Sequence, residues 1–192
     1  IDRMKFSEEL KKRLVNVRKL VFENDKRINE VSKRIAEHFS KDVKPSGFKA
    51  LLVVSTRLAA IKYARELKKL LSEDEVEALV TYNESEEDPF ILDYLKYLKQ
   101  KYQKGLKSYE DVNEIIKNNF QFAENPKMLV VVNKLITGFD EKKIQTIYID
   151  RFMNGYTLLQ AIGRCNRRYE EKGKANGLVV DFVGIIDELK KA

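Results

Sequence analysis

The chain has 192 residues, which is enough for one packed domain or for one domain with an accessory segment. A hydrophobic fraction of 43% and a charged fraction of 35% exclude a disordered chain, and no apolar run approaches the roughly 20 residues that a membrane span needs. The formal net charge of +7 favours an anionic partner such as nucleic acid, although a lysine-rich solubilising surface explains the charge equally well.

The only cysteine, Cys165, cannot form an internal disulfide, and no signal peptide precedes the charged first residues. We therefore expect a cytoplasmic protein. We interpret Cys165 as a small buried residue, because no base or metal ligand accompanies it in the sequence. The first residue is Ile1 rather than Met, so we expect the chain to be a fragment of a longer protein.

Two amphipathic helices are predicted before residue 45, over residues 6–22 and about 25–39. The lone histidine, His38, lies near the end of the second helix, where a cap or a solvated side chain is the natural interpretation. Pro45-Ser46-Gly47 then breaks the pattern. We predict a helical linker or flanking segment over residues 1–45 and the main domain over residues 46–192.

From residue 50 onward, short apolar runs alternate with amphipathic stretches. Buried strands are expected at 50–54, 77–82, 128–132, 144–149 and 177–183, with helices between most of them. Residues 83–123 form a helical insertion of unassigned function. This alternation predicts an α/β domain with a parallel sheet and helices on both faces.

Ligands of such sheets collect at the carboxyl ends of the strands. Three polar segments follow predicted strands directly: Ser55-Thr56-Arg57, residues 133–140, and Arg151. We expect them to lie at one edge of the sheet.

The segment Leu158–Arg168 concentrates positive charge. On a helix, Gln160, Arg164 and Arg167 share one face. Two guanidinium groups and an amide suit an anion with several oxygen atoms. Because the segment holds no other active-site group, we interpret it as half of a phosphate site.

The sequence contains no Gly-x-x-x-x-Gly-Lys-[Ser/Thr] phosphate loop and no strand that ends in paired carboxylates for magnesium. We therefore expect no metal site here and no ATP hydrolysis by the isolated chain. Arginines that reach a phosphate bound elsewhere can still accelerate phosphoryl transfer by ~10³–10⁵.

Three segments resemble the motifs of superfamily-2 helicases and translocases, in the order found in the second RecA-like motor domain. Leu52–Arg57 resembles motif IV, Leu129–Val132 with Thr137–Asp140 resembles motif V, and Gln160-x-x-Gly163-Arg164-x-x-Arg167 resembles motif VI. The resemblance implies a RecA-like fold.

Within that superfamily, the sequence of this chain is most similar to that of the motor (R) subunit of type I restriction enzymes. The similarity covers about residues 48–186 and rests on four pieces: Leu135–Asp140, Tyr148–Arg151, Leu158–Arg167 and Gly177–Ile185.

This resemblance implies a role for each matching residue. Arg167 corresponds to an arginine finger and Arg164 to its partner at the γ-phosphate. The other implied nucleotide contacts are Gln160, Gly163, Gly138 and Asp140, and the implied contacts to the DNA backbone are Ser55, Thr56, Arg57 and Thr137.

The resemblance also implies a cofactor and partners. ATP with Mg²⁺ would be bound mainly by an upstream RecA-like domain of the same chain, and the motor would move on double-stranded DNA. Modification and specificity subunits would complete the complex, with DNA recognition in another subunit.

Several alternatives stay open. Asn133 stands where the family pattern has an acidic residue, Ser55 and Thr137 suit simple capping roles, and Asp140 suits a helix cap. The domain could belong to another superfamily-2 DNA helicase, or be a degenerate RecA-like module that binds nucleic acid without ATPase activity.

Overall fold

The computed structural model describes residues 16–17, 19–81, 86–102, 108–132, 141–153 and 155–185. Much of the first predicted helix lies outside these ranges, and so do residues 133–140. No helix in the described ranges is long and apolar enough to cross a membrane.

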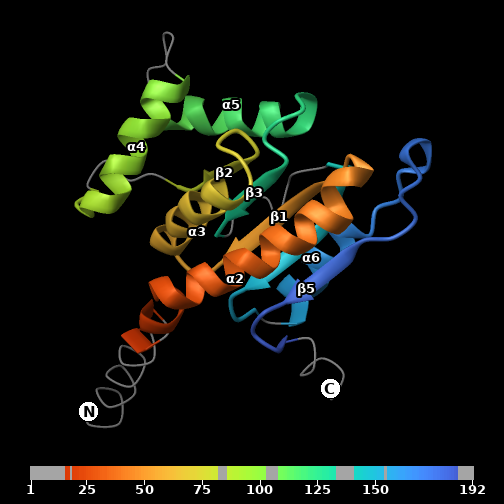
Figure 1. Ribbon diagram of the computed structural model, residues 1–192, viewed down its shortest axis with the longest axis horizontal. Helices are drawn as coiled ribbons and strands as arrows, with labels where there is room; N and C mark the ends of the chain where they lie inside the picture. The colour runs from red at the N-terminus through yellow and green to blue at the C-terminus, as the bar shows by residue number, and fades with distance from the viewer. Residues whose placement is uncertain are drawn as a thin grey trace.

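A five-stranded sheet with the order β2-β3-β1-β4-β5 forms the centre of the molecule (Figure 1), and every pairing in it is parallel. The strands are β1 (Lys49–Val54), β2 (Val76–Leu79), β3 (Met128–Val131), β4 (Ile144–Asp150) and β5 (Leu178–Asp181). Each lies within a few residues of its predicted position. The predicted α/β fold with a parallel sheet is confirmed.

The central strands are rich in β-branched and other apolar residues, and they are buried on both faces. All six residues of β1 and all four of β3 are buried. This explains why they appear in the sequence as continuous apolar runs rather than as alternating patterns.

Helices cover both faces of the sheet. The chain moves in one direction across the sheet from β1 to β2 through α3 (Arg57–Leu70), and in the opposite direction from β4 to β5 through α6 (Gly155–Cys165). Right-handed crossovers therefore place α3 and α6 on opposite faces.

Helix α2 (Asp25–His38) packs against α3. Its buried residues Ile28, Val31 and Ile35 belong to the same apolar cluster as the sheet. The predicted break is present, because a 3-10 turn over Lys44–Ser46 follows the π-helical turn Phe39–Val43 and ends at Gly47, whose φ is +70°. The segment before β1 thus shares the core of the sheet, and the division of the chain at residue 45 stays a prediction.

The predicted insertion contains α4 (Pro89–Tyr102) and α5 (Tyr109–Phe122), which lie beside the edge strand β2 (Figure 1). Ser108 and Asp111 form a reciprocal capping box at the start of α5.

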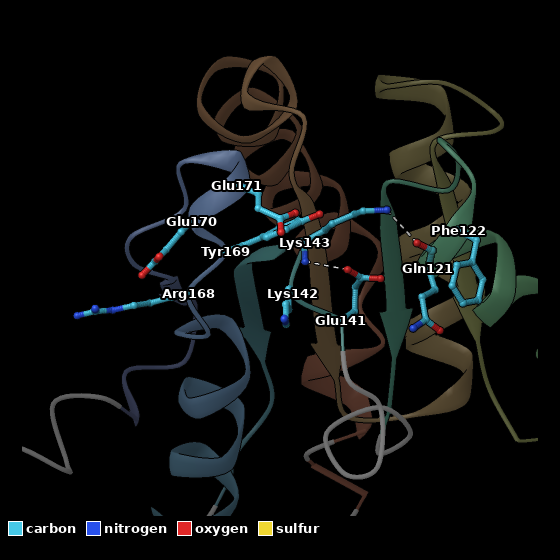
Figure 2. Close-up of a pocket in the computed structure, with 9 residues that line it drawn as sticks. All are labelled: Gln121, Phe122, Glu141, Lys142, Lys143, Arg168, Tyr169, Glu170 and Glu171. Atoms are coloured by element: carbon cyan, nitrogen blue, oxygen red, sulfur yellow. Dashed lines mark hydrogen bonds between the residues drawn. The ribbon is translucent and has the colours of Figure 1, made fainter.

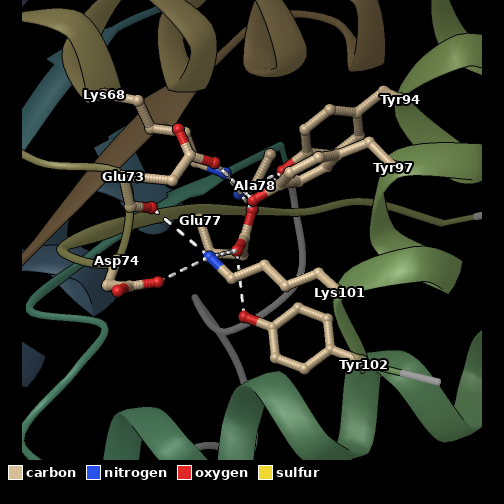
Figure 3. A network of polar contacts seen from close by, with 9 residues as sticks. All are labelled: Lys68, Glu73, Asp74, Glu77, Ala78, Tyr94, Tyr97, Lys101 and Tyr102. Atoms are coloured by element: carbon tan, nitrogen blue, oxygen red, sulfur yellow. Dashed lines mark hydrogen bonds and ion pairs between the residues drawn. The ribbon is translucent and has the colours of Figure 1, made fainter.

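One buried carboxylate, that of Glu77 on β2, attaches α4 to the sheet (Figure 3). It accepts hydrogen bonds from the Tyr94 and Tyr102 hydroxyls at 2.6 and 2.9 Å. It also pairs with the ammonium groups of Lys68 and Lys101 at 2.8 and 3.2 Å. A buried carboxylate with a full set of partners fixes the helix firmly, because any displacement would leave the charge unpaired.

Candidate functional site

The carboxyl edge of the sheet brings two of the predicted segments together. Ser55, Thr56 and Arg57 follow β1, and Arg151 follows β4. Val54 and Asp150, the last residues of these two strands, are register partners, so the two segments start side by side. The predicted placement of these polar residues at one edge is confirmed.

Thr56 is the N-cap of α3, and its hydroxyl oxygen accepts a hydrogen bond from the Ala59 amide at 3.1 Å. The same hydroxyl donates to Oε1 of Glu23 at 2.7 Å. This side chain therefore links the start of α3 to the segment that enters α2.

The guanidinium of Arg57 already binds two neighbouring groups within the chain. Its Nη1 lies 2.5 Å from the carboxylate of Glu86, which is largely buried, and it donates weakly to the Thr81 carbonyl at 3.4 Å. Any phosphate that binds Arg57 must compete with this carboxylate.

The sequence did not point to Asp150 as a centre of contacts. Its fully buried carboxylate accepts two hydrogen bonds from the guanidinium of Arg27 on α2 and one, at 2.6 Å, from the Tyr63 hydroxyl on α3. The hydrogen bond to Asp150 raises the pKa of Arg27, whereas burial and the Asp150 charge raise the pKa of Tyr63. A carboxylate at the end of a buried strand requires a cation, which is the signal that could have found this pair.

The next residue, Arg151, extends the contacts to β3. Its Nη1 donates to the Val132 carbonyl at 2.7 Å, directly before residues 133–140. Burial lowers the pKa of Arg151 from its usual value, but an arginine remains charged at neutral pH.

Helix α6 carries the predicted phosphate-binding residues on its outer side. Leu158, Ala161 and Cys165 are buried against the sheet, whereas Gln160 and Arg164 lie on the other side and are partly exposed. Beside them lie Tyr156 and Leu159, which are 72% and 61% exposed, and Gly163, where an added Cβ would meet no atom within 4 Å. In this chain the outer side of α6 is an open surface that mixes apolar and cationic groups.

The prediction that Arg164 and Arg167 share one helical face is wrong. Helix α6 ends at Cys165, and Arg167 lies two residues beyond it, exposed, in the turn that leads to β5. The chain before β5 passes directly against the last residues of the helix. A Cβ on Gly177 would lie 2.2 Å from the Cys165 carbonyl oxygen.

The two groups of candidates lie in different parts of the molecule. Helix α6 leaves the carboxyl end of β4 and runs toward the amino end of β5. Its length of about 16 Å therefore separates Arg167 from the carboxyl edge. The motif V residues Thr137, Gly138 and Asp140, together with Asn133, lie outside the described residues.

A hollow of about 820 Å³ lies at the amino ends of the strands, away from Ser55–Arg57. Figure 2 shows its lining side chains around the tails of the strand arrows. The lining residues are Gln121, Phe122, Glu141, Lys142, Lys143, Arg168, Tyr169, Glu170 and Glu171. Within the described ranges, no group of three or more His, Cys, Asp and Glu side chains could hold a metal ion.

Comparison with known proteins identifies the fold. A fragment described as an HsdR subunit of a type I restriction enzyme from Vibrio vulnificus superposes with a TM-score of 0.59 at 18% identity, over 88% of this chain and 30% of that one. The C-terminal domain of the DEAD-box protein Dbp5 gives 0.52 at 17% identity, over 83% of this chain and 76% of that one. The RecA-like fold predicted from the motifs is confirmed.

Sequence comparison identifies the family. A Methanocaldococcus jannaschii protein that carries the name of a type I restriction enzyme endonuclease subunit, MjaVIIP, is 37% identical over 182 residues, which are 91% of this chain and 17% of that protein. The chain thus spans about a sixth of the length of the curated relatives it matches. The family model for domain 3 of the type I restriction enzyme R subunit matches residues 46–184, and the chain belongs to this T1R_D3-like family.

Proposed function

We propose that this chain is the second motor domain of an ATP-dependent DNA translocase in a type I restriction enzyme R subunit, and that it supplies the arginine half of the ATP site. The observation that carries the proposal is the outer side of α6. It presents Gln160 and Arg164 beside exposed Tyr156 and Leu159 and the open space over Gly163. Exposed apolar side chains next to cationic ones are typical of a surface that another domain covers.

In this proposal the covering domain is an upstream RecA-like domain that binds ATP with Mg²⁺. Arg164 and Arg167 approach the γ-phosphate from this chain and stabilise the negative charge that spreads over its oxygens during transfer. Gln160 and Gly163 lie against the nucleotide, and Gly138 and Asp140 contact it from the motif V segment. The chain alone holds only half of the site and does not turn over ATP.

The carboxyl edge is the proposed surface for double-stranded DNA. Ser55, Thr56, Arg57 and Thr137 would contact phosphates, which needs donors and positive charge but no reading of bases. The Glu86 carboxylate, which pairs with Arg57, is then a built-in competitor of the DNA phosphate. Sequence recognition is left to a specificity subunit, which acts with a modification subunit in the same complex.

The test uses the complete R subunit that carries this chain, assembled with its partner subunits. Arg164→Ala should lower DNA-stimulated ATP hydrolysis by at least about 100-fold, since one preorganised donor in such a site is worth that much. Lys96→Ala, which removes one positive charge from the exposed side of α4, should leave the rate unchanged. Equal rates for Arg164→Ala and the wild type would refute the proposal.

A further inference from the structure

Arg167 and Arg168 lie beyond the end of α6, so the helix alone does not determine where their side chains reach. Their placement depends on residues 166–177, which we call the α6 exit loop. Figure 2 shows Tyr169, Glu170 and Glu171 of this loop beside the amino ends of the strands, with the Arg168 side chain pointing away from them. Three contacts hold the loop: two bring its ends together, and one ties its middle to the sheet.

The first contact is between backbone atoms. A Cβ built on Gly177 would lie 2.2 Å from the carbonyl oxygen and 2.3 Å from the carbonyl carbon of Cys165, and 2.8 Å from the Asn166 nitrogen. Backbone atoms cannot rotate away as the end of a flexible side chain can. Position 177 therefore requires a residue without a Cβ, and the glycine lets the chain that enters β5 lie directly against the end of α6.

The second contact joins the two ends of the loop through a side chain. The Gly177 amide donates to Oδ1 of Asn166 at 3.3 Å. Because Asn166 directly precedes Arg167, this hydrogen bond fixes the backbone next to the arginine. Cys165 is buried just before it and anchors the other side.

The third contact ties the middle of the loop to the sheet. Tyr169 and Lys174 exchange two backbone hydrogen bonds of 3.1 Å around a 3-10 turn that ends at Gly173, whose φ is +70°. The ammonium of Lys174 is buried and donates to the carbonyls of Lys142, at 2.9 Å, and Ile144 at the amino end of β4. Burial lowers the pKa of Lys174, and the nearby charge of Arg167 acts in the same direction.

We propose that Gly177 and Asn166, with Lys174 as the anchor to the sheet, are positioning residues that hold Arg167 in place for the phosphoryl-transfer site. The inference rests on the proposed function of Arg167. Arg167 itself makes the contact with the phosphate, and the loop acts only through it. An arginine that must meet a developing charge tolerates little displacement, since a misplacement of about 1 Å can cost about 100-fold in rate.

The experiment measures DNA-stimulated ATP hydrolysis by the complete R subunit in its complex. Gly177→Ala forces the end of α6 away from β5 and should lower kcat by about 10- to 100-fold. The KM for ATP and the Kd for DNA should stay within about twofold of the wild type, because other residues supply most of the binding. Asn166 is exposed, so Asn166→Ala threatens folding less. It should lower kcat by about 3- to 10-fold and likewise leave the KM for ATP and the Kd for DNA nearly unchanged.

Two controls accompany these variants. Gly47→Ala adds a Cβ at a glycine before β1, with φ +70° and no atom within 4 Å of the added carbon, and should leave kcat unchanged. Arg167→Ala tests the underlying function separately. If this substitution leaves the turnover unchanged, the proposed function fails. If it abolishes turnover while Gly177→Ala and Asn166→Ala do not change it, only the positioning role fails.

The inference is overturned if Gly177→Ala and Asn166→Ala both turn over ATP at the wild-type rate. It is also overturned if kcat, KM and DNA affinity all deteriorate together, because that pattern indicates general loss of structure. If Gly177→Ala does not assemble into the complex, the kcat and KM of Asn166→Ala decide alone.

Discussion

Arg27 and Asp150 lie 123 positions apart in the sequence and form a forked ion pair at the carboxyl edge of the sheet. The side chain of Asp150 is 1% exposed and that of Arg27 is 25% exposed. The pair connects α2 to the end of β4, directly before Arg151. Glu23, just before α2, binds Thr56 at the same edge. The N-terminal segment is thereby attached to the ends of both β1 and β4, and the end of β1 leads into the proposed DNA contacts Ser55, Thr56 and Arg57.

The pair should contribute strongly to stability. Arg27→Met leaves the buried Asp150 carboxylate with only the Tyr63 hydroxyl, so we expect the free energy of unfolding to fall by about 3–5 kcal/mol. The matched control is Lys33→Met, which breaks an exposed pair with Glu30 and should cost less than about 1 kcal/mol. Urea unfolding of the chain measures both, and similar losses for the two variants would contradict the structure.

Stability should depend on pH through Lys49. Its buried ammonium donates to the carbonyls of Phe120, Ala123 and Pro126 around the end of α5. Burial, with a smaller contribution from Lys143, lowers its pKa to about 8 from an ordinary value of 10.5. Between these two values the unfolded chain binds more protons than the folded chain, so the stability contributed by this residue rises with pH.

The comparison of wild type with Lys49→Met isolates this effect. The difference in their free energies of unfolding should shift in favour of the wild type by about 1–3 kcal/mol between pH 8 and pH 10. Above pH 10 the stability of both proteins should fall, because burial raises the pKa of Tyr63, Tyr102 and Tyr148 and the unfolded chain loses those protons first. A difference that does not vary with pH would show that Lys49 keeps an ordinary pKa.

Substitution of Gly163 should change stability and turnover in opposite directions. It lies inside α6 with open space around its missing Cβ, so Gly163→Ala should stabilise the isolated chain by about 1 kcal/mol through helix propensity. In the complete enzyme the same methyl group would enter the proposed nucleotide interface, and DNA-stimulated turnover should fall at least about tenfold. Thermal unfolding and steady-state hydrolysis test the two halves, and a more stable variant with full activity would place the interface elsewhere.

DNA binding by the chain should be weak, independent of sequence and strongly dependent on salt. Arg57→Ala should weaken it and reduce the slope of log K against log salt by about one. Glu86→Gln removes the competing carboxylate and should strengthen binding by a few-fold. Fluorescence anisotropy over a salt series measures these effects, and identical affinities for the wild type and Glu86→Gln would exclude Arg57 from the DNA surface.

Local patterns in the sequence predict much of this fold. The short apolar runs of β1 and β3 indicate strands buried on both faces, and their alternation with helices predicts the parallel sheet. The parallel sheet in turn predicts that Ser55–Arg57 and Arg151 lie at one edge, because the carboxyl ends of parallel strands meet there.

Contacts between distant residues account for what the sequence did not predict. The helical periodicity of the sequence continues through Arg167, but α6 ends at Cys165. At that point Gly177, 12 positions away in the sequence, lies directly against the helix end. In the same way, Arg27 is one of several charged residues on the polar side of α2, and only the folded chain shows that it meets Asp150. Such pairings depend on topology and leave no periodic signal.

The most direct test of the account is ATP hydrolysis by the complete R subunit with its partner subunits, with and without duplex DNA, for the wild type and Arg167→Ala. We expect hydrolysis that DNA stimulates in the wild type and that falls by about 10³-fold or more in the variant, while DNA binding is retained. DNA-stimulated hydrolysis that survives in Arg167→Ala would contradict the proposal that this chain donates the arginine of the ATP site.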